Sequence, residues 1–173
     1  MSVADRLPAR VSLRDVSLRD GLQDETPIAT DAKVAIFQAL VAAGVRDLEL
    51  TSFVRPDRVP AMADAEALCS ATADQADEVG VTRWGLVLNA RGAQRALAAG
   101  LTHLQYVVSV SDTHSRHNAG AGTDESLDEF ERFAAEATGK PVIELPAEIT
   151  TRMNDPRVAG VIRDQQFLFQ SRQ

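Results

Sequence analysis

The chain has 173 residues, of which 45% are hydrophobic and 25% charged, a composition typical of one globular domain with a sizeable core. Its net charge of -7 argues against a nucleic-acid surface or an anionic membrane as partner, and no apolar run is long enough to span a bilayer. The single Cys69 excludes an internal disulfide framework, and residues 1–10 lack the apolar core of a signal peptide, so we expect a cytoplasmic protein.

The chain alternates short apolar strands with amphipathic helices. The β-rich runs predict strands over residues 11–18, 46–51, 83–89 and 103–110. Apolar residues at helical spacing predict helices over residues 31–43, 61–76, 92–99 and 124–138. Thr30 and Thr123 are the predicted N-caps of the first and last helix, 111–122 is predicted to be a polar loop, and a fifth strand is expected to begin near Pro141.

This alternation indicates parallel strands joined by crossover helices, either as a doubly wound sheet or as a TIM barrel. No Gly-x-Gly-x-x-Gly turn or P-loop follows a predicted strand, which weakens the nucleotide-binding version. Polar residues instead follow each strand, as they do in TIM-barrel active sites. We therefore favour an α/β fold that forms a partial TIM (β/α)8 barrel, with about four strand–helix units and a candidate fifth strand.

An adjacent arginine and aspartate, Arg19 and Asp20, follow the first predicted strand and precede Gly21. Aspartate is a hard oxygen ligand suited to Mg²⁺ or Mn²⁺, and arginine offers a planar donor fork to a carboxylate or an enolate oxygen. A surface ion pair beside a turn explains the same two residues. The local sequence leaves both interpretations open.

Three motifs give this pair a wider context. They are Arg-Asp-Gly-Leu-Gln-Asp-Glu at 19–25, Leu-Glu-Leu-Thr-Ser-Phe-Val at 48–54 with Val-Pro-Ala-Met-Ala-Asp at 59–64, and Val-Ser-Val-Ser-Asp-Thr-His-Ser-Arg-His-Asn at 108–118. In order and spacing they resemble hydroxymethylglutaryl-CoA lyase, a member of a metal-dependent lyase and synthase group built on a TIM barrel. Arg-Asp-Gly is shared with the isopropylmalate and citramalate synthases of that group, whereas the Thr-Ser-Phe-Val block points to the lyase. The resemblance covers residues 11–142.

The resemblance implies a retro-Claisen cleavage of hydroxymethylglutaryl-CoA to acetyl-CoA and acetoacetate, assisted by Mg²⁺ or Mn²⁺, in leucine degradation or related acyl-CoA catabolism. A Claisen condensation of acetyl-CoA with a 2-oxo acid is the alternative reaction in the same group. By position, Asp20 resembles the metal-ligating aspartate and Arg19 the substrate-facing catalytic arginine. Glu49 resembles a glutamate that handles a proton or supports the site; a buried acid paired with Arg19 explains it equally well.

The substrate side of the resemblance implies further contacts, and each has an ordinary structural alternative. Gln23 is a candidate substrate ligand or a turn residue, and Asn89 is a candidate substrate ligand or the cap of the next helix. The loop containing Ser111, Arg116 and His117 resembles the CoA side of the site mouth, although a solvated loop has the same composition.

Some reactive residue types are interpreted as structural. The spacing of His114 and His117 suits a metal, but the family's ligand histidines lie in a later His-x-His motif, so we disfavour that reading. His103 precedes a strand, and Cys69 lies on a predicted helix and matches no catalytic cysteine of the family.

The resemblance fades after Val142. We divide the chain into an N-terminal extension at 1–10, a partial lyase barrel at 11–145 and a divergent tail at 146–173. Because no His-x-His motif, late Asn ligand or Gly-rich cysteine loop occurs in the chain, we expect weak cation binding and no turnover by this chain alone. Residues 167–169 either cover the open barrel or follow a disrupted reading frame, which we prefer. A non-catalytic half barrel that pairs with a second copy or a separately encoded half is a further hypothesis.

Overall fold

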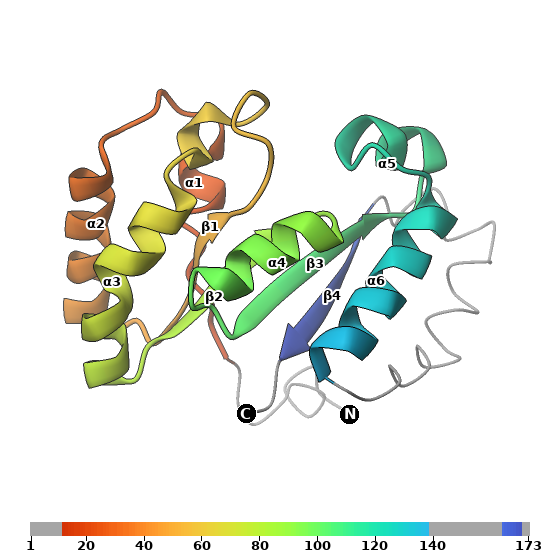
Figure 1. Cartoon of the computed structure of the whole chain (residues 1–173). Helices are drawn as coiled ribbons and strands as arrows, with labels where there is room; N and C mark the ends of the chain where they lie inside the picture. The colour runs from red at the N-terminus through yellow and green to blue at the C-terminus, as the bar shows by residue number, and fades with distance from the viewer. Residues whose placement is uncertain (1–11, 139–163, 171–173) are drawn as a thin grey trace, which may run out of the picture.

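The computed structural model describes residues 12–138 and 164–170 (Figure 1). They contain one sheet with the strand order β1-β2-β3-β4. Strands β1 (Asp47–Ser52), β2 (Thr82–Val87) and β3 (His103–Ser109) are parallel, whereas β4 (Asp164–Gln170) runs antiparallel to β3. The prediction of a parallel α/β sheet is therefore confirmed for the three central strands.

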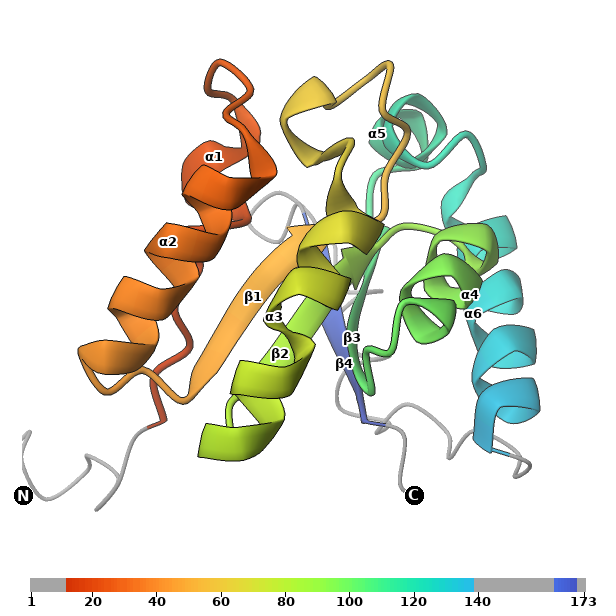
Figure 2. The ribbon, with the colours of Figure 1, turned by 60° about the vertical axis from the view of Figure 1, so that its left-hand side comes forward.

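Helices precede, connect and follow the three parallel strands. The long ones are α2 (Thr30–Ala42), α3 (Ala65–Val79), α4 (Ala90–Ala98) and α6 (Thr123–Thr138). The short ones are α1 (Asp20–Gln23), the 3₁₀ turn η2 (Pro60–Met62) and α5 (Asp112–Asn118). Figure 2 shows α3 and α4 in front of the sheet, with α6 beside α4. Because α3, α4 and α6 each contact the sheet, they cover one of its faces. This is the arrangement that a strand–helix barrel requires of its outer layer.

The core lies between this face of the sheet and the helices. Alternate strand residues such as Leu104, Tyr106 and Val108 are buried there, as the period of a strand dictates. The Tyr106 ring packs 4.9 Å from the ring of Phe130 in α6. Its hydroxyl donates to Glu129 Oε2 at 3.0 Å, and burial raises the pKa of Tyr106 above its usual value. The third strand and the last helix are therefore joined by both apolar and polar contacts.

The predicted strand over 11–18 is wrong for its described part. Only Asp15 bridges to the sheet, where it accepts from Glu49 N at 2.8 Å and donates to Asp47 O at 3.0 Å. The Asp15 carboxylate then accepts from the backbone N–H of Ser17 at 3.0 Å, which turns the chain after a single bridging residue. Arg19 consequently lies in a turn immediately before α1, and it does not follow a strand as predicted.

Other local predictions also need correction. The predicted loop 111–122 contains α5, because Ser111 caps a short polar helix. The predicted helix over 61–76 is two elements, η2 and α3. Neither predicted threonine acts as a cap: Thr30 donates its hydroxyl to Asp64, and Thr123 donates its hydroxyl to Ser109 O. The fifth strand near Pro141 lies outside the described residues.

The tail contributes a strand that the sequence did not predict. Strand β4 pairs with the whole of β3, from His103 opposite Gln170 to Ser109 opposite Asp164. An open strand edge presents unpaired N–H and C=O groups, and β4 satisfies those of β3 on that side. The backbone of residues 167–169 thus covers the sheet edge, in agreement with the covering interpretation of this segment.

Helix α4 begins so close to the segment after β1 that only glycine fits at its third position. A Cβ at Gly92 would lie 2.7 Å from Phe53 O. We expect Gly92→Ala to lower the free energy of unfolding by about 1–3 kcal/mol, because the backbone would have to move apart. Urea denaturation measures this change.

The matched control is Gly21→Ala in α1, where a new Cβ meets nothing closer than 3.9 Å. This control should be neutral or stabilising by up to about 1 kcal/mol, because alanine favours the helix. A Gly92→Ala variant as stable as the parent protein would contradict the close approach of α4 to Phe53.

Candidate active site

Arg19, Asp20 and Glu49, which were predicted to belong to one site, lie together. Arg19 Nε donates to Glu49 Oε2 at 2.6 Å, and Arg19 Nη1 donates to Asp20 Oδ1 at 2.6 Å. The side chains of Arg19 and Glu49 are 10% and 5% exposed, whereas that of Asp20 is 61% exposed. One guanidinium therefore joins a buried carboxylate of β1 to an exposed carboxylate at the start of α1.

The geometry leaves specific atoms available for a ligand. Nη2 of Arg19 makes no hydrogen bond to a described residue, so it can still donate to a substrate oxygen. Asp20 binds Arg19 through one oxygen, and its exposed carboxylate can still offer the other to a cation. Because the buried Glu49 fixes the guanidinium, both groups are held in place before any ligand arrives.

The start of α1 sets the direction of the Asp20 side chain. The backbone N–H groups of Asp20 and Gly21 donate to Val16 O at 2.8 and 3.1 Å, which closes a tight turn before the helix. Gln23 is the last residue of α1, and its side chain makes no hydrogen bond to a described residue. Gln23 therefore lies one helical turn from Asp20, with its amide free of the protein partners described.

The residues present fit one position of a cation site. The exposed Asp20 carboxylate is a hard oxygen group of the kind that Mg²⁺ and Mn²⁺ prefer, and it could hold one position of such an ion. Among residues 12–138, no group of three or more His, Cys, Asp or Glu side chains is arranged to hold a metal ion. The described part of the chain therefore contains no complete cation site built from such side chains.

Asn89 has the structural role that was its alternative interpretation. It is the N-cap of α4, where its Oδ1 accepts from Gly92 N at 2.9 Å. This bond occupies one acceptor position of Oδ1. The structure therefore explains Asn89 without a substrate.

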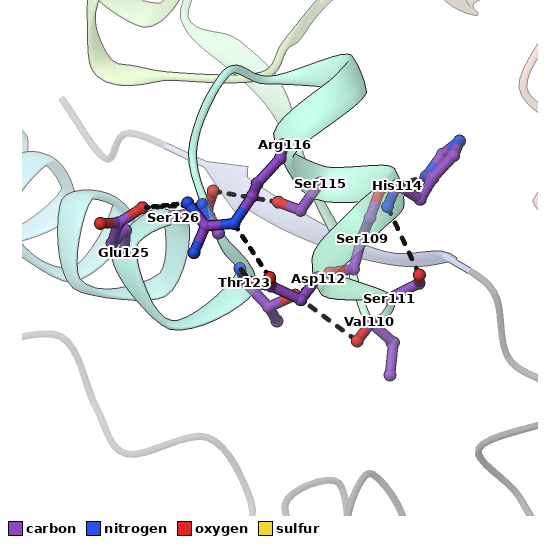
Figure 3. A network of polar contacts seen from close by, with 11 residues as sticks. Ser109, Val110, Ser111, Asp112, His114, Ser115, Arg116, Thr123, Glu125 and Ser126 are labelled. Carbon is purple, nitrogen blue, oxygen red and sulfur yellow. Dashed lines mark hydrogen bonds and ion pairs between the residues drawn. The ribbon is translucent and has the colours of Figure 1, made fainter.

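The segment after β3 forms a polar network around α5 (Figure 3). Arg116 Nε donates to Asp112 Oδ2 at 3.0 Å, and Arg116 Nη1 lies 3.5 Å from Glu125 Oε2. The Arg116 guanidinium, together with the N–H of Thr123, holds the pKa of Asp112 below its usual value. Arg116 is thus neutralised by two carboxylates, and a phosphate would have to compete with them.

Of the other residues predicted in this segment, Ser111 caps a helix and His117 is exposed to solvent. Ser111 is the N-cap of α5 and accepts from His114 N at 3.4 Å. His114 Nδ1 lies 2.7 Å from Ser109 Oγ at the end of β3. His117 is exposed in the last turn of α5. The described contacts do not bring these residues to the cluster of Arg19, Asp20 and Glu49.

His103 occupies the structural position expected of it. Its ring packs edge-on against Trp84 at 4.9 Å, and its Nδ1 lies 3.0 Å from Thr102 Oγ1. Burial lowers the pKa of His103 below its usual value. This residue begins β3 and therefore lies at the opposite end of that strand from Ser109 and α5.

Sequence reasoning missed two sets of buried polar residues. The first is Lys33 with Asp64. The position of Lys33 four residues before Phe37, on the apolar face of α2, could have indicated that this lysine is buried. The second comprises buried polar atoms without a partner among the described residues, including Ser52 Oγ and Gln105 Nε2. The sheet register places Ser52, Leu86 and Gln105 in one row across the three parallel strands. Ser52 lay within a recognised motif, but nothing in the sequence marked Gln105.

Comparison with known proteins identifies the family. A family model described as HMGL-like matches residues 10–164. The chain belongs to the HMGL-like family. Hydroxymethylglutaryl-CoA lyase YngG of Bacillus subtilis is 40% identical over 121 residues, which cover 69% of this chain and 40% of that protein. The (R)-citramalyl-CoA lyase of Chloroflexus aurantiacus is 38% identical over 132 residues, or 72% of this chain and 42% of that protein.

Solved lyase structures agree with the fold. The crystal structure of the Bacillus subtilis HMG-CoA lyase superimposes with a TM-score of 0.70 and 30% identity, over 90% of this chain and 56% of that one. An HMG-CoA lyase from Acinetobacter baumannii, in complex with coenzyme A and 3-methylmalate, gives a TM-score of 0.66 and 32% identity over 74% of this chain and 41% of that one. The expected partial TIM barrel is confirmed, and the chain spans about two fifths of its curated relatives.

Two findings bear on the remaining expectations. None of the helices in the described residues combines the length and apolar character needed to cross a membrane. Cys69 is buried in the core, and this burial raises the pKa of its thiol to about 12. The structural interpretation of Cys69 is therefore supported by both its position and its chemistry.

We expect Cys69 to resist a thiol reagent such as iodoacetamide in the folded protein at about pH 8, because the thiolate is the reactive form and burial suppresses it. Mass spectrometry after a timed incubation measures the labelled fraction. The control is the same protein unfolded in urea, which should take up one label per chain because Cys69 is its only cysteine. Rapid labelling of the folded protein would show that the helix α3 is not packed as described.

Proposed function

We propose that this chain supplies the Arg19, Asp20 and Glu49 portion of a divalent-cation-dependent acyl-CoA lyase site that cleaves hydroxymethylglutaryl-CoA. The observation that carries the proposal is the guanidinium held at 2.6 Å from a buried and an exposed carboxylate. Family membership supports the reaction class, and the coenzyme A complex of a structural neighbour supports an acyl-CoA substrate.

The proposed reaction breaks one carbon–carbon bond. The tertiary hydroxyl of the substrate loses its proton, its carbon becomes the ketone of acetoacetate, and the electron pair of the broken bond leaves on the acetyl-CoA enolate. The enolate carbon then takes up a proton, which completes acetyl-CoA. When bound, Mg²⁺ or Mn²⁺ would polarise the hydroxyl and carboxylate oxygens of the substrate.

Each residue of the cluster has a proposed task. Arg19 donates from Nη2 to the oxygen on which negative charge develops, in the manner of an oxyanion donor. Asp20 offers its exposed oxygen to the cation. Glu49 orients Arg19, and its second oxygen is the candidate acceptor of the hydroxyl proton. Gln23, one turn along α1 from Asp20, is a proposed substrate contact. Ser111, Arg116 and Asn89 are weaker candidates because each already has a protein partner. His117, on α5, is also a weaker candidate because no described contact brings it to the cluster.

The proposed site needs ligands beyond those in residues 12–138. Asp20 is a single ligand, and the three histidines of the chain include no His-x-His pair. We propose that a second half barrel, which carries the ligands missing from this chain, provides the rest. We also propose that the lyase domain spans residues 11–145 and that the protein is cytoplasmic.

A second acyl-CoA is an alternative substrate. One relative is an (R)-citramalyl-CoA lyase, which favours citramalyl-CoA as the alternative substrate. Both relatives described above are lyases, so cleavage is favoured over the condensation run by the related synthases.

We expect Asp20 to be a weak cation site that is measurable without activity. Millimolar Mn²⁺ should broaden the backbone NMR signals of α1 selectively, because a paramagnetic ion at Asp20 relaxes nearby nuclei even when it binds weakly. Asp20→Asn should abolish this broadening, since it removes the charged oxygen.

The matched control for this substitution is Asp57→Asn. Asp57 is also 61% exposed and also pairs with an arginine, Arg55, at 2.6 Å. Its replacement should leave the broadening of α1 unchanged. Equal broadening of α1 in the Asp20→Asn variant would remove Asp20 from the proposed cation site.

We expect the chain alone to show no metal-dependent lyase activity above background with either substrate. A chimera in which residues 12–138 replace the matching segment of the Bacillus subtilis lyase should be active, because the missing ligands are then present. In the chimera, Arg19→Met should reduce kcat about 10²–10³-fold, as the loss of an oxyanion donor typically does.

Two outcomes of this assay would contradict the proposal. Clear turnover by the chain alone that Asp20→Asn abolishes would mean that no further half is needed. An active chimera that is insensitive to Arg19→Met would remove Arg19 from the reaction. Asp57→Asn again serves as the control and should leave kcat within about twofold of the parent chimera.

A further inference from the structure

A lysine is buried where α2 meets the turn η2. The side chain of Lys33 is 2% exposed, and it shares one face of α2 with Phe37 and Val41. Its ammonium donates to Ala61 O at 2.6 Å and to the carboxylate of Asp64. Lysine is almost never this buried unless it is paired, so the contact with Asp64 is what permits its position.

The partner carboxylate is shared between two residues of α2. Asp64 accepts from Lys33 through one oxygen and from Thr30 Oγ1 through the other, at 2.7 Å. Asp64 is also the N-cap residue of α3, yet its side chain makes no capping hydrogen bond to that helix. An aspartate at an N-cap normally bonds its own helix. Here that bond is replaced by a cross-link to α2.

This cross-link, formed by Thr30, Lys33 and Asp64, fixes η2 from one side. Ala61, which accepts from Lys33, is the middle residue of η2. On its other sides η2 packs against α1, the helix that begins at Asp20, and Met62 Sδ lies 3.6 Å from Thr51 Oγ1 of β1. The turn η2 therefore contacts both elements that carry the carboxylates bound to Arg19.

We propose that Lys33 is a positioning residue for the site. Through η2, the cross-link sets α1 against β1 and so fixes Asp20 and Glu49 at the distance that one guanidinium can span. The functional meaning of this inference rests on the proposed function of the Arg19 cluster. The geometric link itself is separate from that function and can be tested without substrate or metal.

The Arg19 Nε–H is a direct reporter of this geometry. It is buried and bonded to Glu49 at 2.6 Å, so it should give a slowly exchanging signal in ¹H–¹⁵N NMR spectra, assigned by its loss in Arg19→Lys. The test variant is Lys33→Met combined with Asp64→Leu. Replacing both members of a buried ion pair by apolar residues generally keeps a protein folded, whereas removing one leaves a charge unpaired.

In the double variant we expect the Arg19 Nε–H signal to shift. We also expect its proton to exchange with solvent about tenfold faster, because local opening becomes easier. Mn²⁺ broadening of α1 should weaken in parallel. The single variant Lys33→Met should lower Tm by about 6–20 °C. Thr30→Val removes only the hydroxyl bond to Asp64, so it should fold normally and move the same signal in the same direction by less.

The control is Phe130→Ala in α6, which removes a buried ring next to Tyr106, away from η2. It should lower Tm by a similar amount and leave the Arg19 signal in place. An Arg19 signal that is unchanged in the folded double variant overturns the proposal, as does one that moves equally in Phe130→Ala. If the double variant does not fold, an unchanged signal in Thr30→Val has the same consequence.

These outcomes are distinguishable from a failure of the proposed function. If Lys33 moves the Arg19 signal but Mn²⁺ never broadens α1 in the parent protein, the positioning role stands and the cation site falls. If Mn²⁺ broadens α1 equally in the parent and the double variant while the Arg19 signal is constant, the cation site stands and the positioning role falls.

Discussion

The Arg19 guanidinium, bonded at once to a buried and to an exposed carboxylate, is the interaction that the rest of the site depends on. Burying one charge is costly, and Glu49 offsets the cost of burying Arg19. The second contact, to Asp20, is made at the protein surface, where water screens it. The pair with Glu49 therefore anchors the guanidinium, and Asp20 keeps its other oxygen exposed for a ligand.

A second buried cation obeys the same rule a short distance along the chain. Lys33 is neutralised by Asp64 as Arg19 is by Glu49, and each pair joins elements that are far apart in sequence. The turn η2 lies between the two pairs, in contact with α1 and held by Lys33. The chain carries 25 acidic and 18 basic residues, so carboxylates are abundant. What is specific is that these two are placed against buried cations.

The sequence predicted those features that depend on local periodicity and missed those that depend on distant partners. Strands β1 to β3 and the long helices follow their apolar patterns, and the motifs placed Arg19, Asp20 and Glu49 together. The strand over 11–18 failed because the Asp15 carboxylate turns the chain, and α5 was missed because it is polar and lacks an apolar period. Lys33 was missed because its partner lies 31 residues away and lysine is ordinarily exposed.

The direction of β4 bears on how such a site can be completed. Strand β3 has two edges, of which one pairs with β2 and the other with the antiparallel β4. A barrel of this family continues with parallel strands, and a parallel neighbour of β3 would use the same N–H and C=O groups that β4 now uses. The two arrangements are mutually exclusive. Any second half that extends the sheet beyond β3 must therefore displace β4. The opposite edge of the sheet is β1, where Asp15 forms a single bridge, and a second half could pair with the β1 backbone on either side of that bridge.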